Sequence, residues 1–247
     1  NYSEKKMKVT KFTYGNPDSD GDITLESDVM IENDSEFDIE FVKGSVIIVN
    51  EDGVTIGGED IDDDGVFIAS KDSGELTVLN WTRVKKNQFK DRNGAAAKAY
   101  ISVTSYRREF VKIGSLDVPS KPGEMTEIKK VISLGGAAEC LGMSCVRGKD
   151  NDEGEMELEF KAGIRNTSDQ YIARAQMTTK AMDQRDAQID DNVDYEALPA
   201  KTGKVFEPSF WGLKYGKLKN GSFNVSASVF LPVDTYSAEA TPKLSED

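Results

Sequence analysis

The chain has 247 residues, of which 38% are hydrophobic and 30% charged, and it carries a formal net charge of −13 with no histidine. This composition is typical of a folded globular protein, and the negative field disfavours nucleic acid or an anionic membrane as the main partner. The absence of histidine removes the usual general base, the commonest zinc ligand and the nucleophile–histidine–acid triads. We therefore expect a protein that is not an enzyme and has no cofactor, unless it binds calcium as discussed below. No apolar run approaches the roughly 18 residues that span a bilayer, so we expect no membrane span.

The first clear strand pattern runs from Ile23 to Asn33, where apolar and polar residues alternate with period two. Such alternation predicts a strand with one buried face. A second strand is expected between Ile39 and Val49. It leads into the turn sequence Asn50-Glu51-Asp52-Gly53, and Asp-Gly between strands is a strong hairpin signal.

An acidic run, Asp60-Ile61-Asp62-Asp63-Asp64-Gly65, follows the hairpin. Alternating carboxylates before a glycine turn can wrap a hard cation, so Asp60, Asp62 and Asp64 are candidate calcium ligands. The twelfth position of a calcium loop should be glutamate, but here it is Lys71. The alternative is a solvated acidic turn without a metal.

Trp81 is followed by a polar, lysine-rich loop that contains Lys85, Lys86 and Lys90. Tryptophan is a favoured interface anchor, and clustered lysines on an acidic chain can dock on an acidic neighbour. We predict an interaction element here. The alternative is that the ring fills the core and the lysines solubilise a hairpin. A further alternating strand begins near Ala99.

Pro119, Pro122 and Gly123 mark a linker. They predict a first β-sandwich over residues 1–115, a linker over 116–123, a second sandwich over 124–236 and a polar tail over 237–247. The second sandwich opens with Cys140 and Cys145, the only cysteines. We predict that they form a disulfide in an oxidising compartment. The alternative is two reduced thiols in a cytosolic loop.

The second half of the chain repeats the first in one ungapped register, which places Asn166 over Asn33 and Ile164 over Ile31. After a short shift of that register, Trp211, the other tryptophan, lies over Trp81. Lys214 and Lys217 follow Trp211, as lysines follow Trp81. We therefore predict an all-β protein of two tandem immunoglobulin-like antiparallel β-sandwiches, related by internal duplication, each with about seven strands in two sheets.

N-x-S/T sequons are more frequent than the composition predicts, which would suit a secreted glycoprotein. Coincidence is the alternative, because asparagine and serine also favour turns. The candidate glycosylation sites are Asn33, Asn80, Asn166 and Asn220, with further sequons at Asn1 and Asn224.

The run SDVMIENDSEFDIEFVKGSVIIVNEDGVTIGG, residues 27–58, resembles the small immunoglobulin-like modules called FxLYD domains and is similar to the WHy module. The copy that begins ELEFKAGIRNTSDQYI, residues 157–172, resembles them more faintly. In these families a strand ends in asparagine, a polar turn follows, and a second strand leads into a hairpin. The signature pentapeptide of the first family is missing here. The resemblance implies a non-catalytic sandwich, usually outside the cytoplasm, with no shared ligand site.

These observations predict a structural or interaction protein of an extracellular or cell-surface assembly, which binds copies of itself or other subunits through strand edges and lysine-rich loops. The start at Asn1 favours signal-peptide cleavage and agrees with that setting. A virion-surface (decoration or tail) protein is one alternative. A carbohydrate-binding module is another, and it requires that the ring of Trp81 or Trp211 be exposed.

Overall fold

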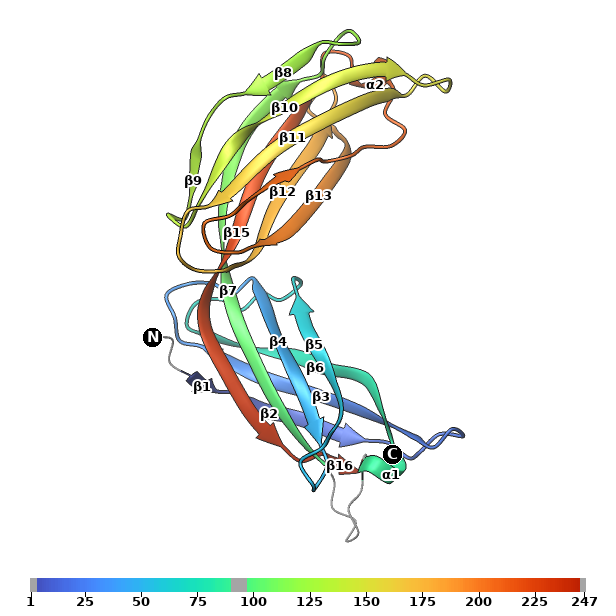
Figure 1. Ribbon diagram of the computed structural model, residues 1–247, viewed down its shortest axis with the longest axis vertical. Coiled ribbons are helices and arrows are strands. Elements are labelled where there is room, and N and C mark those ends of the chain that lie inside the picture. The colour runs from blue at the N-terminus through green and yellow to red at the C-terminus, as the bar shows by residue number, and fades with distance from the viewer. Residues whose placement is uncertain (1–3, 90–96, 245–247) are drawn as a thin grey trace. The chain divides into compact units, whose positions relative to one another are not determined.

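The computed structural model describes residues 4–89 and 97–244 (Figure 1). It is 66% strand and 3% helix, which confirms the all-β prediction. Contact clustering divides the chain into two compact units. Unit 1 comprises residues 1–108 and 232–247, and unit 2 comprises residues 109–231. Among the described residues, no helix is long and apolar enough to cross a membrane.

Unit 2 is therefore inserted between two segments of unit 1, which differs from the predicted boundaries. The predicted linker 116–123 lies inside unit 2, and much of the predicted tail 237–247 is strand. Two long strands, β7 (Lys98–Asp117) and β15 (Ser222–Ala240), each contribute residues to both units. The tail was misread because its outward residues are polar, whereas Tyr236 is only 1% exposed and belongs to the core of unit 1.

Unit 1 is a β-sandwich of two sheets. One sheet has the order β5-β4-β7-β15, and β1 pairs in parallel with β15. The other has the order β16-β2-β3-β6, and a short helix, α1, follows β6. The bounds are β1 Glu4–Lys6, β2 Lys8–Tyr14, β3 Asp22–Asn33, β4 Phe41–Val49, β5 Thr55–Asp63, β6 Asp72–Lys85, α1 Lys86–Phe89 and β16 Lys243–Leu244.

Unit 2 is also a β-sandwich. One sheet has the order β13-β12-β15-β7, and the other has the order β14-β11-β10-β8, with β9 also paired to β10. The bounds are β8 Met125–Ile128, β9 Ile132–Leu134, β10 Ala138–Asp150, β11 Met156–Asn166, β12 Ile172–Met182, β13 Gln188–Leu198, β14 Gly203–Phe206 and α2 Tyr215–Leu218. Each unit has its own apolar core, as the alternating strand patterns predict.

Asn33 and Asn166 occupy matching buried sites at the ends of β3 and β11, where they are 0% and 1% exposed. The amide nitrogen of Asn33 donates to the carbonyl oxygens of Phe37, Ile68 and Ala69, at 2.8, 3.1 and 3.0 Å. Its oxygen accepts from the hydroxyl of Ser35 at 2.7 Å. The side chain therefore ties a strand end to the next loop and to a third segment of its unit.

The amide nitrogen of Asn166 donates in the same way to Gln170, Leu198 and Pro199, at 2.7, 3.1 and 3.1 Å, and its oxygen accepts from Ser168 at 2.8 Å. These bonds occupy both amides, and burial closes them to solvent. Asn33 and Asn166 are therefore structural residues, and their prediction as glycosylation sites is wrong. Asn80 and Asn220 are exposed and stay predictions.

Candidate functional site

Trp81 lies at a β-bulge in β6 and projects into solvent. Ser27 of β3 pairs with Leu79, and Leu25 pairs with Thr82, so two residues of β6 stand opposite one of β3. Trp81 adopts a φ of 63°, a left-handed conformation that is costly for an aromatic residue. The side chain is 67% exposed, while Leu79 is only 1% exposed. The alternative in which this ring fills the core is therefore wrong.

Trp211 is presented differently, on the loop between β14 and α2. Its neighbour Phe210 packs against Phe160 and Phe223, with ring centroids 5.4 and 5.7 Å apart. Leu213, two residues after Trp211, is 4% exposed and anchors the other side of the loop. Both anchors belong to unit 2 and hold the backbone in place, yet Trp211 itself is 88% exposed. The chain thus fixes an indole ring in solvent.

Two of the basic residues after Trp81, Arg83 and Lys85, pair with carboxylates of unit 1. The ammonium group of Lys85 lies 2.6 Å from a carboxylate oxygen of Asp22, and Arg83 lies 4.0 Å from Asp18. The hydrogen bond to Asp22 raises the pKa of Lys85. Lys86, the first residue of α1, is also exposed, and Lys90 lies outside the described residues. The interaction element predicted after Trp81 is thus largely paired with the turn at residues 18–22 of the same unit.

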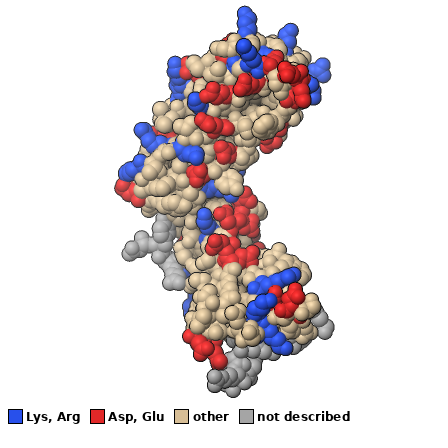
Figure 2. All heavy atoms as spheres, turned by 45° about the vertical axis from the view of Figure 1, so that its right-hand side comes forward, with Lys and Arg blue, Asp and Glu red and all other residues tan. Residues whose placement is uncertain are grey.

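The basic residues after Trp211 are differently placed. Lys214, Lys217 and Lys219 are exposed, and none of them forms an ion pair with a described acidic side chain. Figure 2 shows Lys and Arg side chains gathered at one end of unit 2, close to a group of Asp and Glu. An unpaired ammonium group loses no existing partner when it docks, so this element is the better candidate for interaction.

A hollow of about 560 Å³ opens beside Trp211. Its walls are the β10–β11 hairpin and the loop 209–212, and they carry the carboxylates of Asp150, Glu155 and Glu157. Asp150 is held by Arg147, whose Nη2 lies 2.8 and 3.1 Å from its two carboxylate oxygens. Sequence reasoning missed this hollow. The acidic run at the hairpin was the signal, but nothing in it shows that the hairpin meets the tryptophan loop.

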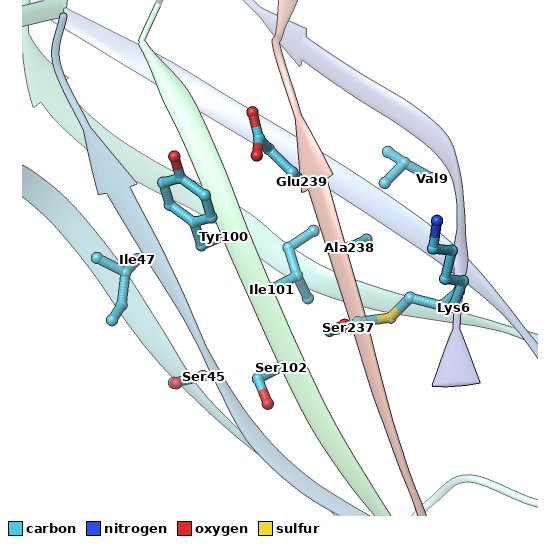
Figure 3. A pocket seen from close by; sticks show the side chains of 11 residues that line it. Lys6, Val9, Ser45, Ile47, Tyr100, Ile101, Ser102, Ser237, Ala238 and Glu239 are labelled. Atoms are coloured by element: carbon cyan, nitrogen blue, oxygen red, sulfur yellow. The ribbon is translucent and has the colours of Figure 1, made fainter. Parts of the chain in front are cut away.

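A second groove, of about 700 Å³, lies on unit 1 where β1 leaves β15 and the chain crosses to the other sheet (Figure 3). Ser45, Ser102 and Ser237 contribute hydroxyls to its lining, while Ile47 and Tyr100 contribute exposed apolar surface. Glu239 at its rim is already paired with Lys98. These groups can hydrogen-bond a small ligand, and none of the lining residues is a histidine or a cysteine.

Cys140 and Cys145 are free and buried, so the predicted disulfide is wrong. Both lie on β10, where they pair with Ile164 and Phe160 of β11. Because those partners are four residues apart along one strand, the Cα atoms of the cysteines are separated by roughly 13 Å. A disulfide needs Cα atoms within about 7 Å. A bulge between Cys140 and Met143 turns both thiols into the core.

The predicted calcium loop is also corrected. Asp60 and Asp62 lie within β5, opposite Ser45 and Lys43 of β4, and Asp62 is 3.6 Å from the ammonium group of Lys43. A strand spreads Asp60 and Asp62 along a line, and Asp64 follows the end of β5. Among the described residues, no group of three acidic, cysteine or histidine side chains is placed to hold a metal ion.

No family model and no curated protein matches the chain. Among solved structures, pT26-6p is similar over 95% of this chain with 6% identity and a TM-score of 0.28. The C-terminal globular domain of an oligosaccharyltransferase from Pyrococcus abyssi is similar over 96% of this chain, with 10% identity and a TM-score of 0.26. This chain spans only 64% and 50% of those two chains.

A carbohydrate-binding module of the β-sandwich superfamily is similar over 97% of this chain and 96% of its own length, with 9% identity and a TM-score of 0.21. All three TM-scores are low, so these likenesses carry no argument about function.

Proposed function

We propose that this chain is a non-catalytic interaction protein of an extracytoplasmic surface assembly, and that it docks on protein neighbours through Trp211 and the lysines in and around α2. The observation that carries this proposal is the combination of a fixed indole ring, 88% exposed, with three lysines that have no described acidic partner. We call Trp211, Lys214, Lys217 and Lys219 the docking element.

Two physical arguments support this role. Large aromatic side chains dominate the energy of protein interfaces, and one held on a fixed backbone loses little conformational entropy when a partner covers it. Lysines beside it attract an acidic partner and speed its encounter. Copies of a chain with a net charge of −13 offer many acidic surfaces.

The β5 edge of unit 1 is less suited to docking than the docking element. This terminal strand carries Glu59, Asp60 and Asp62 as exposed residues. Charged side chains on an edge strand disfavour pairing with another strand. We therefore place docking on the docking element and not on the β5 edge.

The proposal includes an origin by internal duplication of an immunoglobulin-like module, as the resemblance of residues 27–58 to exported modules suggests. The matched hydrogen bonds of Asn33 and Asn166 support duplication. So do the turns at Asp18 and Asn151, where in each case one side-chain oxygen accepts two backbone N–H groups at 2.9 to 3.0 Å. The extracytoplasmic setting rests on the resemblance alone, because the separated cysteines no longer support it.

Carbohydrate binding is a second candidate. It is favoured by one observation, namely that Trp211 stands at the rim of a hollow with the planar side chains of Asp150, Asn151 and Glu155. A sugar ring can stack on indole while its hydroxyls bond to carboxylates and amides. A place on a virion surface is compatible with the same docking element and differs only in the partner.

Photo-crosslinking in the native source tests the proposal. Benzoylphenylalanine replaces Lys217 in the docking element, or the exposed Arg185 of unit 2 as a matched control. We expect a protein adduct from position 217 that disappears when Trp211→Ala is added, and little adduct from position 185. Mass spectrometry of the adduct separates a surface assembly from a virion. Equal yields at both positions, or no protein adduct at position 217, would refute the proposal.

A further inference from the structure

The surface around Trp211 carries two opposite charges in two adjoining halves. The basic half consists of the three lysines of the docking element. The acidic half is the β10–β11 hairpin, where five carboxylates outnumber the exposed Lys149, namely Asp150, Asp152, Glu153, Glu155 and Glu157. The halves meet where Lys214 forms a backbone bridge with Glu155. Trp211 lies on the border, at the rim of the hollow.

Neither half neutralises the other within unit 2. None of the ion pairs between described residues involves Lys214, Lys217, Glu155 or Glu157, although Lys214 and Glu155 are directly opposite. The corresponding charges in unit 1 do pair, since Lys85 binds Asp22. Unit 2 therefore presents both signs of charge to solvent, side by side, around one exposed aromatic ring.

We propose that this face is self-complementary and joins two copies of the chain in a symmetric dimer. The inference rests on the proposed function and names its partner. A two-fold axis near Trp211 sets the basic half of each copy against the acidic half of the other. Each indole ring then covers the hollow of the opposite copy, which at about 560 Å³ is large enough to admit it. A symmetric interface of this kind uses the same patch twice.

The mixture of charges selects a second copy over other partners. A purely acidic protein surface would satisfy the lysines but would be repelled by Glu155 and Glu157, and like charges brought together at an interface weaken binding. A neutral glycan would cover Trp211 and the carboxylates but would leave the lysines unused. A second copy, related to the first by the two-fold axis, satisfies all of these groups.

Charge exchange between two variants tests the dimer directly. One variant carries Lys214→Glu, Lys217→Glu and Lys219→Glu. The other carries Asp152→Lys, Glu155→Lys and Glu157→Lys. Sedimentation velocity should show a wild-type dimer, and each variant alone should dissociate with a Kd at least about tenfold higher. An equimolar mixture should restore dimers, because each variant then meets its complement. Circular dichroism checks that both variants fold.

The matched control reverses Lys129 and Lys161, lysines of unit 2 that already pair with Glu127 and Glu159. This double reversal should leave the dimer intact. A wild-type chain that stays monomeric up to high concentration, or folded variants whose mixture remains monomeric, overturns the inference. If the photo-crosslink at position 217 still captures a different protein, only the symmetric dimer fails. If it captures no protein, the proposed function fails as well.

Discussion

The two tryptophan loops show how one sequence pattern gives surfaces with different charge pairing. In both, an exposed indole precedes a lysine-rich segment and a short helix whose Phe89 or Leu218 is buried. Around Trp81, the turn at 18–22 supplies carboxylates that bind Arg83 and Lys85. Around Trp211, the corresponding turn at 151–155 leaves the lysines unpaired. Two loops of similar pattern therefore differ in charge pairing, because small changes in the placement of carboxylates decide which lysines remain unpaired.

The largest expected difference between the units is that the core of unit 2 contains cysteine thiols where the core of unit 1 has apolar side chains. The register that places Asn166 over Asn33 also places Cys140 and Cys145 over Met7 and Phe12, which are buried apolar residues of unit 1. The thiols thus stand where unit 1 has apolar side chains, and burial raises the pKa of Cys145 to about 12 from 9.0. At pH 8 the thiolate should be about a thousandfold scarcer than in the unfolded chain. We expect near-complete protection from iodoacetamide in the native protein and two modified thiols after unfolding.

The same shift sets a pH dependence. A raised pKa means that the folded state holds its proton more tightly, so the contribution of Cys145 is complete below pH 9 and falls as the pH rises from about 9 toward 12. Cys145→Val should remove this part of the alkaline loss of stability. Rapid alkylation of the native protein would contradict the burial of both thiols.

Substitution of Asn33 or Asn166 should have the next largest effect, and it should appear in the free energy of unfolding. Asn166→Ala removes one hydrogen-bond donor from each of the carbonyls of Gln170, Leu198 and Pro199, and Asn33→Ala does the same to Phe37, Ile68 and Ala69 in unit 1. Each change should lower the free energy of unfolding by about 3 kcal/mol or more, because buried partners lose their hydrogen bonds. Urea unfolding measures this, with the exposed Asn80→Ala as a control that changes little. A large loss in only one unit would break the equivalence of the two sites.

Substitution by glycine and substitution by alanine should change the stability of the protein differently at Trp81 and at Trp211. Trp81 has a φ of 63°, a conformation that glycine adopts freely, so Trp81→Gly should be about 1 kcal/mol more stable than Trp81→Ala. The described non-glycine residues with positive φ do not include Trp211, so Trp211→Ala should be at least as stable as Trp211→Gly. Thermal unfolding of the four variants compares the two loops. A Trp81→Ala variant as stable as Trp81→Gly would contradict the left-handed backbone of the bulge at Trp81.

The smallest expected difference between the units is the loss of stability of their turns in acid below pH 3.8. Backbone N–H groups of Asp22 and Asp20 bond to the carboxylate of Asp18 and lower its pKa below 3.8. A lowered pKa contributes stability that is present above pH 3.8 and lost as the pH falls further. Asn151 occupies the matching position and does not titrate. Asp18→Asn should therefore reduce the acid sensitivity of unit 1, as followed by NMR signals of residues 18–22.

The sequence predicted the strands, the hairpin turns and the all-β class, because alternation and turn residues are local signals. It did not predict the partners that meet only in the folded chain. The insertion of unit 2 depends on the pairing of β15 with β1, which come from opposite ends of the sequence. The cysteines were misassigned because their spacing was read as a loop, although the repeat register, extended upstream, places them over Met7 and Phe12. The paired lysines of unit 1 and the hollow beside Trp211 likewise depend on contacts between distant segments.

The insertion of unit 2 also sets the order in which the two units would unfold under a pulling force. The strands β1 and β16 both belong to unit 1, where β1 pairs with β15 and β16 pairs with β2. A pull applied between β1 and β16 therefore loads these short pairings first. Unit 2 begins and ends in β7 and β15, which lie side by side, so the load reaches it only after unit 1 has opened. The unit that carries the docking element is thereby shielded from force applied along the chain.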